Sequence, residues 1–309
     1  SAPPCSAPCP AARARGGFKI ALEILNSGRL GLSAGSARGT RAMMKHAIDY
    51  AKEREQFGKP IGAFEMIQKK IALAAVDCYA ADAGWMLCAG MVDRGAIDFS
   101  LETAACKIYA SELAFRSANE ALQIAGGIGY SKEFPYERFV RDSRINLIFE
   151  GTNEILRALI ALMGLQQPGE EMKAVGKAFQ DPLHSLGAIS SYLTGRVKRT
   201  LVKPDFTKVH PLLEDEAEMV AENIHSLALA VEKALIEHGK AIIDRQMLHE
   251  RMANAAIDIY LSTAVLSRVT SALEKHGEEG ATADLDAARI FIPMRSEEHT
   301  SELQSLTNL

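Results

Sequence analysis

The sequence contains few of the features that mark disulfide-rich, metal-binding or nucleic-acid-binding proteins. Its five cysteines are an odd number and form no Cys-x-x-Cys pair, so we expect neither a metal site nor a disulfide framework. The formal net charge of -4 gives no reason to expect a nucleic acid as partner. No uninterrupted apolar run approaches the roughly 20 residues that span a bilayer, and we therefore expect a soluble protein.

Aromatic residues are also scarce, at 6% of the chain, although 48% of it is apolar. Alanine, leucine, isoleucine and methionine are plentiful, and these residues favour helices. Three of the cysteines, Cys78, Cys88 and Cys106, fall within helical patterns. We interpret them as small buried apolar residues of a protein in a reducing compartment.

Both ends of the chain have unusual compositions. Residues 1–15 are rich in proline, alanine and arginine, and we interpret them as disordered or artefactual because they lack the apolar stretch of a secretory signal. Residues 293–309 include RSEEHTSELQS, which starts at Arg295 and looks like a translated sequencing adapter. We interpret this tail as artefactual and expect the sequence to be a fragment of a longer gene product.

Between these ends, apolar residues recur at alternating spacings of three and four, which is typical of helices packed in a bundle. The sequence predicts an all-α fold in which an up-down helical bundle at 16–166 is followed by a second helical region at 212–292. Pro168 and Gly169 mark the expected boundary, and a basic linker over 167–211 is expected to join the two regions.

The linker contains six basic residues and one acidic residue between Lys173 and Lys203. Basic residues beside apolar ones can dock on anionic lipid, so this stretch is compatible with a membrane-surface segment. A plain solvated linker is the alternative.

Three short segments differ from ordinary bundle sequence: REQFGKPI at Arg54–Ile61, QIAGGIGY at Gln123–Tyr130 and IFEGTNEI at Ile148–Ile155. Together with GGFKIALEILNSGRLG at Gly16–Gly31, they resemble the acyl-CoA dehydrogenase family and occur in the family's order. The chain looks most like the very-long-chain type, which has an additional helical region at its carboxyl end. The resemblance extends to Ile292.

The resemblance implies an FAD-dependent enzyme that α,β-dehydrogenates a long-chain fatty acyl-CoA to the trans-2-enoyl thioester in fatty acid β-oxidation. Removal of the α-proton needs a carboxylate held in a dry pocket. Glu150 fits this role, because it follows the apolar pair Ile148 and Phe149 and precedes Gly151, where the backbone can turn tightly against a ligand. The alternative for Glu150 is a solvated acid near the start of a helix.

By the same resemblance, other motif residues contact the cofactor or the substrate. The residues implied in FAD binding are Arg54, Gln56, Phe57, Gln123, Gly126, Gly127, Thr152, Asn153 and Glu154, with Arg54 and Gln56 reaching the flavin of a neighbouring subunit. The residues implied in acyl-CoA binding are Asn26, Arg29, Phe149 and Gly151. Three simpler interpretations stay open: a surface arginine at Arg54, a plain turn at the glycine loop and a helix cap at Thr152.

The resemblance also implies partners and a location. We expect a homodimer that passes electrons to an electron-transfer flavoprotein, with possible peripheral membrane contact. The protein would be on the matrix side of the mitochondrial inner membrane if eukaryotic and cytoplasmic if bacterial. The family's amino-terminal helical domain and middle β-domain are missing from this sequence, so we expect the chain alone to be inactive. Two other functions stay open: a non-enzymatic helical assembly protein derived from the family, and an acyl-CoA oxidase.

Overall fold

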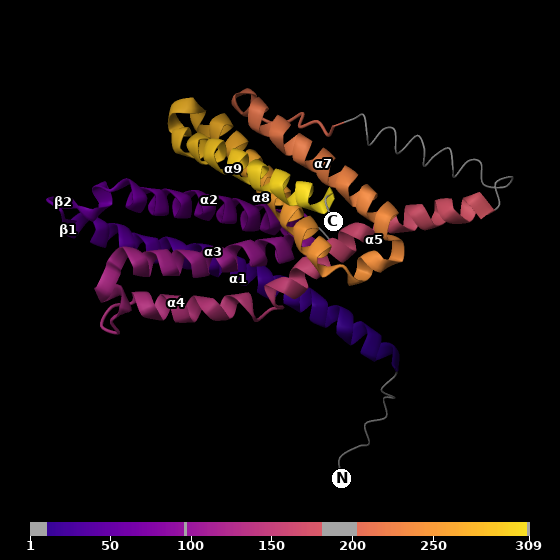
Figure 1. Ribbon diagram of the computed structural model, residues 1–309, viewed down its shortest axis with the longest axis horizontal. Helices are drawn as coiled ribbons and strands as arrows, with labels where there is room; N and C mark the ends of the chain where they lie inside the picture. The colour runs from indigo at the N-terminus through magenta and orange to yellow at the C-terminus, as the bar shows by residue number, and fades with distance from the viewer. Residues whose placement is uncertain (1–10, 96–97, 181–202, 308–309) are drawn as a thin grey trace, which may run out of the picture.

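The structure, a computed structural model, describes residues 11–95, 98–180 and 203–307, and these are almost entirely helical (Figure 1). The helices are α1 (Ala11–Glu53), α2 (Glu65–Asp93), α3 (Ser100–Ala125), α4 (Tyr136–Arg144), α5 (Asn153–Gln180), α7 (Glu214–His238), α8 (Gln246–Gly280) and α9 (Thr282–Thr307). The all-α fold class is confirmed.

The first four helices pack together within the region 16–166, where a bundle was predicted. Helices α1, α2 and α3 contact one another, and α4 lies against α3. Alanines face the helix contacts, among them the buried Ala37, Ala104 and Ala118. Because small side chains let helix backbones approach closely, α1 and α3 pack along much of their length.

A hairpin separates α1 from α2. Strands β1 (Glu55–Gln56) and β2 (Lys59–Pro60) are antiparallel and lie at one tip of the molecule (Figure 1). Phe57 and Gly58 form the turn and both have positive φ, 52° and 79°. A hairpin of this length cannot be distinguished from a loop by periodicity, so the sequence predicted no strand here.

Helix α5 continues through Pro168 as far as Gln180, beyond the boundary expected from the sequence. A proline removes one helical hydrogen bond and crowds the preceding turn, which bends a helix but need not end it. Most of the basic stretch from Lys173 to Lys203 lies outside the described residues.

Helices α7, α8 and α9 form the second group, and α8 packs against both α2 and α5. Leu261 of α8 is seated against Gly84 of α2, where an added Cβ would lie 2.7 Å from its Cδ2 atom. One continuous apolar core contains residues of both groups, including Ile108, Leu156 and Phe291. The second group is therefore packed onto the first and does not form a separate body.

At both ends of the chain, helices extend into the stretches that were interpreted as disordered or artefactual. Helix α1 begins at Ala11, within the stretch that we expected to be disordered, whereas residues 1–10 lie outside the described part. Helix α9 runs through the suspected artefactual tail, where His299 is 1% exposed and Arg295 pairs with Asp77. All residues of the predicted site lie outside that tail.

Helix α2 is the most apolar long helix of the described residues. It is long and apolar enough to cross a membrane, with a mean hydropathy of 1.4 over 18 residues, although 56% of that window is buried in the molecule. No such helix was expected, because the small apolar residues of α2 are interrupted by acids such as Asp77 and Asp82. Cys78, Cys88 and Cys106 are buried and free, as predicted.

Candidate active site

The predicted base lies in a loop with an unusual backbone. Glu150 and Gly151 follow a short 3-10 helix, Ile145–Leu147, and precede α5, with φ values of 59° and 95°. The left-handed region costs a residue with a Cβ atom about 1–2 kcal/mol, so Glu150 keeps this conformation only because its surroundings impose it. Such imposed conformations concentrate at functional sites.

The carboxylate of Glu150 points at helix α1. A Cβ added to Gly28 would lie 2.9 Å from both carboxylate oxygens, so glycine leaves the space that this side chain occupies. The Oε2 atom is buried and has no hydrogen-bond partner among the described residues. A buried acceptor without a partner costs about 1–3 kcal/mol, so this oxygen does not contribute to stability in the part of the chain that the structure describes.

Two residues predicted to bind substrate hold this loop from α1. The guanidinium of Arg29 donates from Nε to the backbone carbonyl of Glu150 at 3.0 Å and from Nη1 to Oδ1 of Asn26 at 3.1 Å. Asn26 donates in turn to the hydroxyl of Ser100 at 3.0 Å. Both Asn26 and Arg29 are only 7% exposed. Burial lowers the pKa of Arg29, and the Glu150 carboxylate opposes this effect.

Lys107 of α3 holds the same loop from the other side. Its ammonium donates to the carbonyl of Gly151 at 2.8 Å and to Oδ1 of Asn153 at 2.7 Å. The residue is fully buried, and burial lowers its pKa to about 8 against the opposing effect of the Glu112 carboxylate. Two cations, on α1 and α3, therefore fix the carbonyls of the base and of its neighbour.

The loop ends in the first turn of α5, where a helix cap was expected. The amide of Ile155 donates to the hydroxyl of Thr152 at 3.4 Å, which is the geometry of an N-cap. The backbone amide of Glu154, followed by the Thr152 hydroxyl, lowers the pKa of the exposed Glu154 carboxyl. Asn153 is buried and uses its amide group on Lys107, Ser111 and Glu112, so only its backbone is left for a cofactor.

The other residues predicted to bind FAD lie at the far end of the bundle. Arg54, Gln56 and Phe57 are exposed on the hairpin, and Phe57 is 93% exposed. Gln123, Gly126 and Gly127 are exposed where α3 ends. One apolar cluster joins these two places, because it includes Ala51 and Ile61 beside the hairpin and Ile124 and Ile128 around the glycine loop.

The structure thus brings the predicted cofactor residues together in two sets. From Lys107 beside the base to Gln123 beside the glycine loop, α3 advances about 24 Å at a rise of about 1.5 Å per residue. The two sets are too far apart to surround one small group.

The residues of both sets have the chemistry that a flavin dinucleotide requires. Added Cβ atoms at Gly126 and Gly127 would meet no atom within 4 Å, so the backbone there is open to a ligand. Arg54 presents an exposed guanidinium, which suits a phosphate. At the other set, exposed Phe149 and Ile148 provide an apolar surface beside the carboxylate. The residues present therefore fit FAD.

Sequence reasoning missed Gly28 and Lys107. A signal for Lys107 was present, because it lies three residues after Ala104 and four before Ser111, within the apolar face of its helix. A lysine at such a position is almost never fully buried unless it has partners. No pattern within the sequence distinguishes Gly28 from other helical glycines.

Two protein-family models match successive parts of the chain. Residues 15–164 match the family model described as acyl-CoA dehydrogenase, C-terminal domain. Residues 211–309 match the model described as ACAD9/ACADV, C-terminal domain, and this match includes the tail at 293–309.

Curated relatives align with most of the chain. The mitochondrial very long-chain specific acyl-CoA dehydrogenase of Rattus norvegicus is 39% identical over 264 residues, and that of Homo sapiens is 37% identical over 263 residues. Each alignment covers 84% of this chain and 40% of the relative, so the chain spans about 40% of the length of these proteins.

A solved structure has the same fold. The acyl-CoA dehydrogenase of Bacillus anthracis complexed with FAD superposes with a TM-score of 0.77 at 24% identity, covering 94% of this chain and 50% of that one. With two family models matched in order and relatives aligned over most of its length, the chain belongs to the acyl-CoA dehydrogenase family and is similar to the carboxyl-terminal helical domains of its very-long-chain members.

Proposed function

We propose that this chain is the part of an FAD-dependent acyl-CoA dehydrogenase that supplies the catalytic base, Glu150. The observation that carries the proposal is the carboxylate itself, which is held by a left-handed backbone against Gly28 and has one buried oxygen without a partner in the described part of the chain. The substrate would be a long-chain fatty acyl-CoA, in keeping with the names of the relatives.

In the proposed reaction, Glu150 takes the proton from the α-carbon of the thioester, and a carbon–carbon double bond forms as a hydride leaves the β-carbon. Bound FAD would supply the acceptor for that hydride. The contribution of this chain is to hold the carboxylate in place and to leave its Oε2 atom without a hydrogen bond, so that this atom can accept the proton. A positioned general base of this kind contributes about 10²–10⁴-fold to the rate.

The separation of the two sets of cofactor residues supports a homodimer. Thr152 and the neighbouring loop lie beside the base, whereas Arg54 and Gly126 lie at the bundle tip, near the far end of α3. We assign the set beside the base to the chain's own flavin and the set with Arg54 and Gly126 to the flavin of a second subunit.

The proposal includes the route of the electrons and the location of the protein. The electrons would pass to an electron-transfer flavoprotein in fatty acid β-oxidation. The protein would lie on the matrix side of the mitochondrial inner membrane if it is eukaryotic and in the cytoplasm if it is bacterial. The names of the rat and human relatives, which include the word mitochondrial, favour the first location. Contact of the basic stretch with the membrane surface is part of the same proposal.

The decisive experiment changes Glu150→Gln in the intact protein that contains this chain. Turnover of palmitoyl-CoA with an artificial electron acceptor is expected to fall by about 10²–10⁴-fold, because glutamine cannot accept the proton. The matched control is Glu237→Gln, an exposed carboxylate of α7, which should leave turnover unchanged.

The outcomes separate the candidate functions. Full activity in the Glu150→Gln protein would contradict the assignment of the base. Turnover that consumes oxygen without an added acceptor would identify an oxidase, and a complete lack of turnover in the unaltered intact protein would favour an assembly protein.

A further inference from the structure

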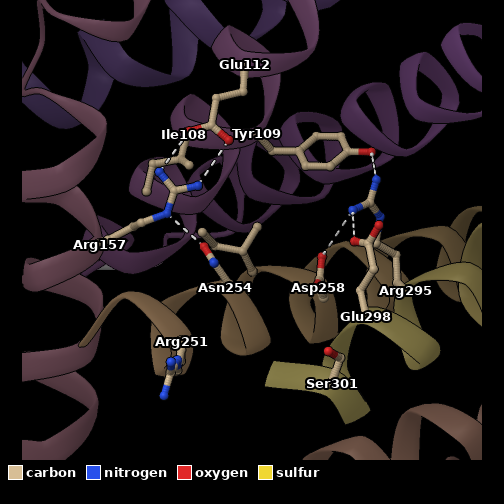
Figure 2. A pocket seen from close by; sticks show the side chains of 11 residues that line it. Ile108, Tyr109, Glu112, Arg157, Arg251, Asn254, Asp258, Arg295, Glu298 and Ser301 are labelled. Carbon is tan, nitrogen blue, oxygen red and sulfur yellow. Dashed lines mark hydrogen bonds and ion pairs between the residues drawn. The ribbon is translucent and has the colours of Figure 1, made fainter. Parts of the chain in front are cut away.

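The catalytic loop is connected to helix α8 by an unbroken series of side-chain hydrogen bonds. Figure 2 shows its outer half, in which Arg157 of α5 lies between Glu112 of α3 and Asn254 of α8. The series runs from Asn254 to Arg157 (2.7 Å), from Arg157 to Glu112 (2.7 and 3.0 Å), from Glu112 to Asn153 (3.0 Å), from Asn153 to Lys107 (2.7 Å) and from Lys107 to the carbonyl of Gly151 (2.8 Å).

The middle of the series is an ion pair of defined geometry between Arg157 and Glu112. Arg157 holds Glu112 through two parallel hydrogen bonds, a geometry that fixes direction as well as distance. The Arg157 side chain is 16% exposed, and Lys107 is fully buried. Arg157 therefore depends on Glu112, whose side chain is 38% exposed, since a cation that is mostly removed from water is strongly unfavourable without a partner.

Asn254 has a particular place in this series because it alone belongs to the second helical group. Its Oδ1 atom accepts from Nε of Arg157, the one guanidinium nitrogen that does not face Glu112. The contact lies at one side of a cavity of about 500 Å³ between α3, α5, α8 and α9 (Figure 2). Asn254 thus holds the Arg157 guanidinium from the side opposite Glu112 and keeps it turned toward that carboxylate.

We propose that Asn254 is a positioning residue for the catalytic loop, acting through Arg157, Glu112, Asn153 and Lys107 on the carbonyl next to Glu150. The role in catalysis depends on the proposed function of Glu150, whereas the mechanical connection does not. The second helical group then has a task in the reaction that is independent of any partner or membrane.

The connection is tested on the 309-residue chain by hydrogen–deuterium exchange of the amides of Phe149, Ile155 and Leu156, which donate hydrogen bonds at the two ends of the loop. In Asn254→Ala, these amides are expected to exchange about fivefold faster, the effect of losing one net hydrogen bond from the local opening equilibrium. Asn254→Asp keeps an oxygen acceptor for Arg157 and should restore slow exchange. The matched control is Asn119→Ala on α3, whose exposed side chain donates to the carbonyl of Phe115 in its own helix.

Two results would overturn the proposal: unchanged exchange at Phe149, Ile155 and Leu156 in Asn254→Ala, or faster exchange spread evenly over α5 and α8. In the intact protein, the same variant is expected to lower kcat about fivefold with KM unchanged and with rescue by Asn254→Asp. If Glu150→Gln is fully active, the proposed function fails, but the exchange result on the chain still decides whether α8 holds the loop.

Discussion

At the scale of single residues, the Glu150 carboxylate lies so close to α1 that there is no room for one additional carbon at Gly28. An added Cβ would be 2.9 Å from both oxygens, so Gly28→Ala must displace the carboxylate. Displacement of a reacting group by about 1 Å can lower a rate about 10²-fold. We therefore expect turnover of the intact protein to fall about 10–100-fold in this variant.

In the same Gly28→Ala variant, the free energy of unfolding is expected to increase although turnover falls. Replacing a helical glycine by alanine stabilises a helix by about 0.5–1 kcal/mol, and the atoms that must move are the far end of a flexible side chain. Gly31→Ala is the matched control for this gain, since an added Cβ there meets no atom within 4 Å. If the Gly28→Ala protein keeps full turnover, or loses turnover only because it unfolds, the close contact between Gly28 and the Glu150 carboxylate is contradicted.

Lys107 gives a prediction for the pH dependence of stability. Its pKa falls from the ordinary 10.5 to about 8 in the folded chain because of burial. The unfolded chain therefore binds more protons between these two values, and this residue makes the free energy of unfolding rise with pH through that window. We expect the difference in unfolding free energy between the chain and its Lys107→Met variant to increase by on the order of 2 kcal/mol from pH 8 to pH 10.

Urea unfolding of both proteins at several pH values measures this difference. Lys208→Met, which removes one exposed cation, is the matched substitution. A difference between the chain and Lys107→Met that does not change with pH would show that Lys107 is not held with a lowered pKa.

The same residue shows what the sequence could and could not predict of the site. Glu150 was predicted from the residues around it, and the structure gives it a backbone that only a constrained loop provides. Lys107 was not predicted, because its partners are a backbone carbonyl and the side chain of Asn153, more than forty positions away along the chain. Contacts of that kind depend on the packing of α3 against the loop, which periodicity does not specify.

At the scale of elements, the sequence predicted helices well where one apolar face recurs over many turns. Helices α2 and α3 lie within the region predicted as a helical bundle, and their buried alanines follow the helical period. Where local signals act over only a few residues, the prediction was weaker. The hairpin between Glu55 and Pro60 and the continuation of α5 through Pro168 are the two examples.

The loop between α4 and α5 is the element on which the proposed function depends, and polar side chains of neighbouring helices hold it in place. Arg29 and Lys107 hold two successive carbonyls, and Thr152 caps the helix that follows. These contacts together impose the positive φ of Glu150. Because three different helices hold this loop, it cannot fully relax when one residue is replaced. Substitutions here should therefore change the position of Glu150, and with it turnover, more than they change the free energy of unfolding.

At the scale of the whole molecule, the second helical group shares one core with the first. Helix α8 contacts α2 and α5, and Leu261 fills the space left by Gly84. The boundary that the sequence predicted near Pro168 is therefore a change in composition and not a gap in packing. This continuity is what allows a residue of α8 to be connected to the loop that carries the proposed base.

The arrangement of the cofactor residues leads to the last prediction, which concerns the chain alone. The set at the bundle tip and the set beside the base are both on the surface, with Phe57 93% and Phe149 43% exposed. A flavin held by one set only would bury little of its area, and affinity for such ligands requires a site that covers most of the ligand. We therefore expect the purified 309-residue chain, incubated with excess FAD and passed through a gel-filtration column, to retain no flavin absorbance. The intact protein that contains this chain is the control and should retain FAD. Stoichiometric retention by the chain would mean that these helices form a complete flavin site by themselves, and the assignment of the two sets to two different flavins would then be wrong.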